Sequence, residues 1–226
     1  MTDPAPIVVE RTDSDCLLIA FGGVADGVNM APFEFWRATR SLPHNRIFVR
    51  DQNRGWYLTG IGDGLDDWLA IWRRLERLVV EIDPRTITVV GASAGGYAAI
   101  LFGCLLDAHV VHAFGPQTTL DVQQLAAMRD GRWERALGPV RGLDHNRDKL
   151  DLRRWYGPAD SGGTEYHIHA CEGHRADRLH VERMRGLRGF HVHLHPCRDH
   201  MPARYLRNTG ALARLLAPID REGARV

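Results

Sequence analysis

Lysine is nearly absent from this chain of 226 residues: Lys149 is the only one, and arginine supplies almost all of the positive charge. The formal net charge is +1, so no overall field attracts nucleic acid or an acidic membrane surface. Long apolar runs are also lacking, since the longest candidate, residues 95–114, is interrupted by Asp107 and two histidines. The N-terminal sequence MTDPAPIVVERTD lacks the basic start and apolar core of a signal peptide. We therefore expect a cytoplasmic protein with no nucleic-acid or membrane partner.

Cysteine is scarce, and its spacing carries no motif. The four cysteines are Cys16, Cys104, Cys171 and Cys197, and no two of them form a C-x-x-C pair. All of them fall in segments with strand or helix character. We expect buried free thiols in a reducing compartment rather than disulfides.

Apolar runs alternate along the chain with segments of helical periodicity. The runs predict strands at residues 6–12, 16–23, 46–51, 86–90, 109–115, 165–171 and 190–195. Helical spacing predicts helices at residues 64–84, 95–108, 177–187 and 203–218. Strands that are apolar throughout predict an α/β fold with a mostly parallel sheet covered by helices on both faces. Residues 117–160 are polar, with one helical piece near 119–129, and we interpret them as a small insertion over the sheet edge. The prediction is one domain spanning residues 1–226.

Serine is also rare, and one of the four serines lies at a sharp corner. The sequence Gly91-Ala92-Ser93-Ala94-Gly95 joins a predicted strand to a predicted helix, which is the context that gives a G-x-S-x-G motif meaning. Such a turn holds a hydroxyl out over the carboxyl end of a sheet, where a base can activate it as a nucleophile. A phosphate-binding turn is the alternative, but no Lys-Ser/Thr pair follows and no G-x-G-x-x-G is present.

From Cys16 to about Leu216 the sequence resembles the α/β-hydrolase family, through this corner, the order of its elements and the glycine pair Gly22-Gly23. The resemblance implies an α/β-hydrolase fold without a large cap. It also implies an acid and then a histidine downstream of Ser93. His200, in the loop after the last strand, is the expected base, and His195 is its rival. The expected acid is Asp177, which would also suit a helix N-cap, with Glu172 as the alternative.

The same resemblance implies an oxyanion hole and a substrate-binding face. One donor would be the N–H of Ala94, directly after the nucleophile, and the other the N–H of Gly23 or Val24. Many relatives have His-Gly-x where this chain has Phe21-Gly22-Gly23. Three residues in loops near the same end of the sheet are candidates for substrate contact: Trp56, Tyr57 and Gln117.

The function predicted from these residues is hydrolysis of an ester or thioester through an acyl-enzyme on Ser93, with no cofactor. The partner would be a small or carrier-bound acyl substrate, and the oligomeric state is left open. Acyl transfer and amide hydrolysis use the same groups and stay as alternatives, as does a non-catalytic binding protein on this scaffold. A metal-dependent enzyme is a further alternative, because histidines alternate along two predicted strands, at His167 and His169 and at His191, His193 and His195.

Overall fold

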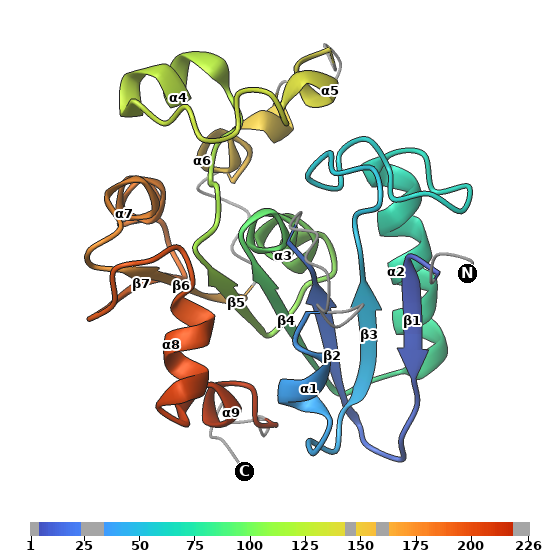
Figure 1. The fold of residues 1–226 in the computed structure, drawn as a ribbon. Coiled ribbons are helices and arrows are strands. Elements are labelled where there is room, and N and C mark those ends of the chain that lie inside the picture. Colours follow the sequence, from blue (N-terminus) through green and yellow to red (C-terminus); the bar gives the residue numbers. More distant parts are fainter. Residues whose placement is uncertain (1–4, 24–33, 143–147, 157–162, 219–226) are drawn as a thin grey trace.

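The structure, a computed structural model, describes residues 5–23, 34–142, 148–156 and 163–218 (Figure 1). Seven strands form one sheet in the order β1-β3-β2-β4-β5-β6-β7. β1 pairs with β3 antiparallel, and the other neighbours are parallel. The strands are β1 (Ile7–Glu10), β2 (Cys16–Phe21), β3 (Asn45–Val49), β4 (Thr86–Ala92), β5 (Val110–Phe114), β6 (Glu165–Cys171) and β7 (Phe190–His195). The seven predicted strands and the mostly parallel sheet are confirmed.

The central strand β2 is apolar throughout because both of its faces are buried. In β2, Leu17 and Ile19 belong to one hydrophobic cluster, whereas Leu18 and Ala20 belong to the cluster on the opposite face. All four side chains are at most 1% exposed. A strand with one solvated face would show alternating polarity instead.

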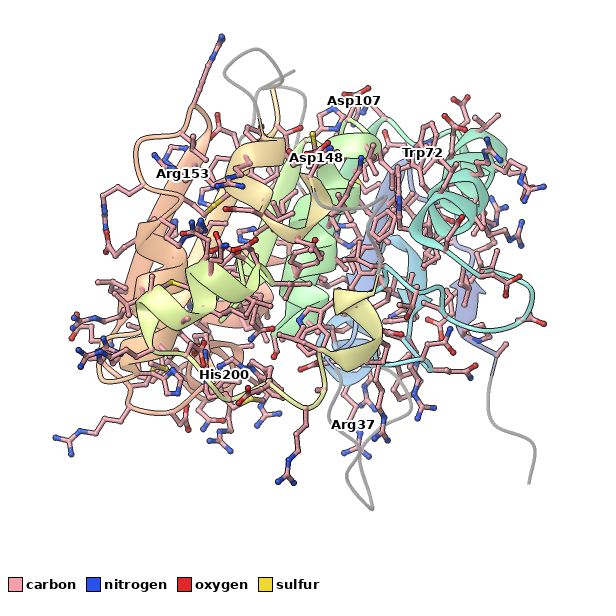
Figure 2. The ribbon with its side chains drawn as sticks, turned by 90° about the horizontal axis from the view of Figure 1, so that it is seen from above. Arg37, Trp72, Asp107, Asp148, Arg153 and His200 are labelled. Atoms are coloured by element: carbon pink, nitrogen blue, oxygen red, sulfur yellow. A yellow bond between two sulfur atoms is a disulfide. The ribbon has the colours of Figure 1, made fainter. Side chains whose placement is uncertain are left out.

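Helices cover both of these faces. The first cluster includes side chains of α2 (Trp68–Ile82), α3 (Ala94–Leu105) and α7 (Arg175–Glu182), and the second includes side chains of α8 (Pro202–Asn208) and α9 (Ala211–Leu215). The short helix α1 (Trp36–Thr39) contacts α9. Seen from above, Arg37 of α1 and Trp72 of α2 lie on opposite sides of the sheet, and His200 lies on the side of Arg37 (Figure 2). The predicted helix 203–218 is two helices, because Gly210 takes a left-handed conformation between them, with φ 72°.

The described part of the segment between β5 and β6 contains three short helices, α4 (Val122–Met128), α5 (Gly138–Arg141) and α6 (Leu152–Trp155). They lie together beyond the end of the sheet to which the arrows of β3 and β5 point (Figure 1). Backbone hydrogen bonds join the two ends of the segment, from Leu120 N–H to the Leu150 carbonyl and from Leu152 N–H to the Thr118 carbonyl. The segment therefore stands over the carboxyl ends of the parallel strands, where such sheets bind ligands.

The prediction of free thiols is wrong for two of the four cysteines. Cys171 and Cys197 form a disulfide, and Cys16 and Cys104 are free. The pairing follows from sheet topology, because Cys171 at the end of β6 is in register with His195 of β7, two residues before Cys197. Neighbouring strands create this proximity, which the linear spacing of 26 residues does not show. Within the described ranges, no helix has the length and apolar character needed to cross a bilayer.

Candidate active site

Ser93 stands at the corner between β4 and α3 with a backbone that L-residues rarely adopt. Its φ is 55° and its ψ is −119°, and it is the N-cap of α3. Its N–H donates to the Phe114 carbonyl of β5 at 2.8 Å, which ties the corner to the neighbouring strand. Strained backbone of this kind persists only where the surrounding structure fixes it, and it is common at functional sites.

The glycines on either side of the corner are required by close backbone contact. A Cβ atom on Gly91 would lie 1.9 Å from the Gly95 carbonyl oxygen. A Cβ atom on Gly95 would lie 2.2 Å from the carbonyl oxygen of Phe21, in β2. The strand, the helix and the end of β2 therefore approach so closely that only glycine fits at both positions.

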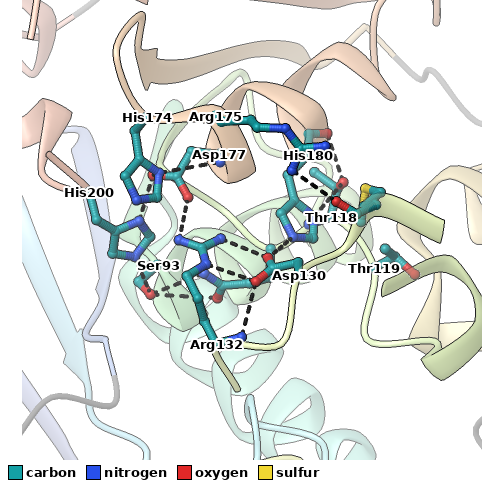
Figure 3. Close-up of polar contacts among 12 residues, drawn as sticks. Ser93, Thr118, Thr119, Asp130, Arg132, His174, Arg175, Asp177, His180 and His200 are labelled. Carbon is teal, nitrogen blue, oxygen red and sulfur yellow. Dashed lines mark hydrogen bonds and ion pairs between the residues drawn. The ribbon is translucent and has the colours of Figure 1, made fainter. Parts of the chain in front are cut away.

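Ser93 is the first member of a chain of hydrogen-bonded side chains (Figure 3). Its Oγ lies 2.9 Å from Nε2 of His200, in the loop between β7 and α8. The other ring nitrogen of His200, Nδ1, lies 2.6 Å from Oδ2 of Asp177, in the first turn of α7. A carboxylate next to Nδ1 favours the tautomer whose Nε2 can accept the serine proton.

The alternative candidates for the acid and the base, Glu172 and His195, lie elsewhere. The side chain of Asp177 is completely buried, whereas Glu172 is exposed. His195 points its Nε2 to Nδ1 of His169, 3.1 Å away on the neighbouring strand. Of the candidates named from the sequence, the structure thus brings Ser93, His200 and Asp177 together.

The insertion supplies a cation to the buried carboxylate of Asp177. Arg132 Nη1 donates to Asp177 Oδ1 at 2.9 Å, and Arg132 Nη2 donates to Asp130 Oδ2 at 2.8 Å. Asp130 also contacts Nε2 of His180 on α7 at 3.1 Å, and the Thr118 N–H donates to Nδ1 of that ring (Figure 3). Two buried carboxylates, one arginine and one histidine therefore form a network that fixes α7 to the insertion.

The pKa values of this network follow from its burial and its pairing. Burial opposes ionisation of Asp130, but the hydrogen bonds from Arg132 and His180 outweigh it and lower the Asp130 pKa. Burial of His180 lowers the pKa of its imidazole despite the nearby Asp130. Asp130 is thus held as an anion, and His180 favours the neutral form.

His174 adds a further contact to Asp177. Its Nδ1 lies 2.9 Å from Asp177 Oδ2, and burial lowers the pKa of the imidazole. In the part of the chain that the structure describes, one group of three or more histidine, cysteine, aspartate or glutamate side chains could hold a metal ion. It consists of His174, Asp177 and His200, whose possible ligand atoms all lie within 4.8 Å of one another. The Arg132 guanidinium already supplies positive charge to the same carboxylate. The arrangement fits a serine–histidine site better than a metal centre.

Two of the three proposed oxyanion-hole donors are described. Ala94 begins α3, and N–H groups in a first helical turn have no acceptor within the helix. Gly23 lies beside Ser93, since a Cβ on Gly23 would be 3.7 Å from the Ser93 Cβ. The Gly23 N–H donates to Oε2 of Glu34 at 2.8 Å. Val24 lies outside the described residues.

Of the predicted substrate contacts, Gln117 is the one that touches Ser93. Its Nε2 donates to Ser93 Oγ at 3.3 Å, and its Oε1 accepts from the Trp56 indole N–H at 3.1 Å. Ser93 Oγ also lies 3.5 Å from Gln117 Oε1, so the Trp56 contact holds the amide group beside the serine hydroxyl. Tyr57 is completely buried and donates its hydroxyl proton to the Gly22 carbonyl at 2.7 Å, so its contact is structural.

Four of the alternating histidines pair with one another across the sheet, whereas His191 contacts the carboxylate of Glu165. His167 Nδ1 lies 3.0 Å from His193 Nε2, and His169 lies within hydrogen-bond distance of both His112 and His195. Burial lowers the pKa values of His169, His193 and His195. Neutral imidazoles, each both donor and acceptor, satisfy one another in such an arrangement.

Sequence reasoning missed the residues that surround the predicted groups. Arg132 and Asp130 lie in a polar stretch with no helical or strand periodicity, and Glu34 lies in a turn before α1. Trp133 packs against both Trp56 and His200, with ring centroids 5.9 Å and 6.3 Å away. The fold brings these side chains to the site from distant segments, and no local pattern marks them.

Comparison with solved structures defines the fold. The capsule O-acetyltransferase of Neisseria meningitidis serogroup A is 14% identical, with 90% of this chain and 88% of that chain covered and a TM-score of 0.64. The fluorophosphonate-binding serine hydrolase F of Staphylococcus aureus is 11% identical, with 90% and 85% covered and a TM-score of 0.61. A thermophilic esterase from Thermogutta terrifontis is 15% identical, with 93% and 92% covered and a TM-score of 0.57. No family model and no curated protein matches the sequence. The chain has the α/β-hydrolase fold.

Proposed function

We propose that this chain is a serine hydrolase of the α/β-hydrolase family, which cleaves an ester or thioester through an acyl-enzyme on Ser93. The observation that carries the proposal is the chain from Ser93 Oγ through His200 to Asp177, with hydrogen bonds of 2.9 and 2.6 Å. The positive φ of Ser93 and the closely packed glycines beside it support the same function. The solved structures with this fold include a serine hydrolase, an esterase and an acetyltransferase.

The proposed reaction has two steps. Ser93 Oγ attacks the acyl carbon while its proton passes to Nε2 of His200, and the Ala94 N–H stabilises the oxyanion. The imidazolium then gives its proton to the leaving alcohol or thiol, and the acyl group stays on Ser93. In the second step His200 takes a proton from water, the hydroxide attacks the acyl carbon, and Ser93 recovers its proton. Asp177 holds the ring of His200 and stabilises its positive charge.

The substrate would be a small or carrier-bound acyl compound. Gln117 touches Ser93 Oγ, and in this proposal its amide group hydrogen-bonds an oxygen of the bound substrate. Trp56 orients Gln117, and its ring packs edge-on against Trp133. These contacts favour a positioning role for Trp56 and a direct one for Gln117.

Acyl transfer is the second candidate, because a solved structure with this fold is an O-acetyltransferase. An acyl-enzyme on Ser93 would pass its acyl group to an alcohol instead of water. The two functions are separated by incubating the protein with an activated ester and increasing concentrations of an alcohol. Rising yields of the new ester at the expense of the free acid favour transfer.

The decisive experiment is treatment of the protein with a fluorophosphonate, followed by mapping of the modified residue by mass spectrometry. We expect modification of Ser93, and none in the Ser93→Ala variant. Modification at another residue, or none in folded protein, contradicts the proposal.

The identity of the acid is tested by comparing the variants Asp177→Asn and Glu172→Gln. We expect Asp177→Asn to lower kcat at least about 100-fold, with little effect of Glu172→Gln.

A further inference from the structure

A carboxylate occupies a donor that the proposed reaction needs. Glu34 Oε2 accepts a hydrogen bond from the Gly23 N–H at 2.8 Å. Gly23 lies two residues after the end of β2, against the Ser93 corner. A Cβ atom placed on Gly23 would lie 3.7 Å from Ser93 Cβ and 3.4 Å from the Ala92 carbonyl oxygen. The same Cβ position is 3.6 Å from Glu34 Oε2, so the Glu34 carboxyl group and the Ser93 side chain both lie within 4 Å of this point.

An N–H group cannot serve a carboxylate and an oxyanion at full strength at once. When Glu34 is ionised, both acceptors carry negative charge, and placing both on one donor would bring like charges together in a buried site. Hydrogen bonds from N–H groups to charged acceptors are also stronger than those to neutral ones. The Glu34 contact and the oxyanion contact of Gly23 are therefore alternatives.

We infer that Glu34 is a further active-site residue, whose carboxyl group holds the Gly23 N–H in the resting protein and leaves it when a substrate carbonyl oxygen arrives. The inference rests on the proposed serine hydrolase function. A substrate would have to displace Glu34 before the second oxyanion donor is available. Glu34 therefore slows acylation of Ser93 until it moves.

The surroundings of Glu34 are consistent with this role. The residue lies in the turn before α1, and its titratable neighbours are His200 and Tyr57. Burial raises the pKa of Glu34, while the Gly23 hydrogen bond and the charge of His200 oppose the rise. The Tyr57 hydroxyl donates to the Gly22 carbonyl next to Gly23, which fixes the peptide that presents the donor.

The test compares the rates at which a fluorophosphonate modifies Ser93 in the wild-type protein and in two variants. Glu34→Ala removes the competing acceptor, and Glu34→Gln keeps an oxygen at that position without its charge. We expect Glu34→Ala to react about tenfold faster or more, because the Gly23 N–H is free, and Glu34→Gln to react at an intermediate rate. Glu134→Gln is the matched control, since Glu134 is an exposed carboxylate of the insertion, and its rate should stay within about twofold of wild type.

A second readout is the affinity for phenylboronic acid, which forms a tetrahedral adduct on a serine and places an oxygen in the oxyanion hole. We expect phenylboronic acid to bind most tightly to Glu34→Ala, less tightly to Glu34→Gln and least tightly to the wild-type protein. Equal or slower modification of Glu34→Ala, with Ser93 still the labelled residue and with an unchanged melting temperature, overturns the inference and leaves the proposed function standing. No labelling of Ser93 in any of the folded proteins overturns the proposed function and the inference with it.

Discussion

Arg132 Nη1 lies 2.9 Å from Asp177 Oδ1, so a guanidinium from the insertion is paired with the carboxylate that also holds His200. Arg132 is partly exposed, with 26% of its side-chain surface accessible, whereas Asp177 is completely buried. A buried carboxylate that loses its cation is strongly destabilised. This contact makes the geometry of the site depend on a segment outside the central sheet.

The first prediction concerns this pair. In Arg132→Met the imidazolium of His200 faces Asp177 without a competing cation, so we expect the acid limb of the kcat/KM profile to move to higher pH. The buried carboxylates of Asp177 and Asp130 also lose their partner, and the free energy of unfolding should fall by about 3 kcal/mol or more. The measurements are a pH–rate profile and urea unfolding.

Arg132→Lys is the matched control for this prediction. Lysine keeps the charge but not the planar fork that reaches two carboxylates, so we expect a smaller loss of stability and little movement of the acid limb. An acid limb at the same pH in all three proteins would show that Arg132 does not act on His200 through Asp177.

The second prediction concerns the close contact at the corner. Gly91→Ala places a methyl group 1.9 Å from the Gly95 carbonyl oxygen, so strand and helix must move apart. We expect a loss of about 3 kcal/mol in stability and at least a tenfold slower modification of Ser93. Gly131→Ala is the control, since none of the described residues lies within 4 Å of its Cβ position, and its melting temperature should hardly change. A Gly91→Ala protein as stable and reactive as wild type would contradict the tight corner.

The third prediction concerns the disulfide between Cys171 and Cys197, which joins the end of β6 to the loop after β7 that also carries His200. Its 26-residue separation predicts a loss of about 3 kcal/mol on reduction, mainly through the entropy of the unfolded chain. Thermal unfolding with and without a reductant measures the loss, and Cys171→Ala/Cys197→Ala should reproduce it. The melting temperature of the double variant should not change when reductant is added. A wild-type melting temperature that does not change on reduction would contradict the disulfide.

The fourth prediction is a loss of stability in acid. Burial lowers the pKa of His44 from 6.5 to about 4, and the pKa values of His169, His193 and His195 are also lowered. Because the unfolded chain binds more protons than the native protein below pH 6.5, stability is present above that pH and is lost as the pH falls towards 4. Urea unfolding between pH 7.5 and about 4.5 measures the slope.

His44 is the sharpest test of this slope, since its two ring nitrogens are buried and find no hydrogen-bond partner among the residues described. His44→Leu should remove up to about 1.4 kcal/mol per pH unit from the slope in that interval. An unchanged slope in His44→Leu would mean that His44 is charged when folded.

Much of the fold could be predicted from the sequence, because the types and spacing of neighbouring residues indicate its strands, helices and turns. Residues 86–90 form an uncharged run rich in β-branched residues, and Ser93 follows it between Gly91 and Gly95. This pattern alone indicated the strand, the corner and the nucleophile candidate. The order of elements then directed attention to Asp177 and His200. The break at Gly210 was missed, since a single glycine within a helical pattern does not fix where a helix ends.

The sequence by itself determined the alternation of strands and helices, the packed glycine corner and the short list of side chains able to accept the Ser93 proton. These features depend on interactions between residues that are near one another in the chain. Only the tertiary structure decided that Asp177 rather than Glu172 contacts His200, that Arg132 and Glu34 reach the site, and that Cys171 meets Cys197. Each of these contacts joins segments that are separate in the chain, and their distances are set by the packing of the sheet and its connections, which no local pattern encodes.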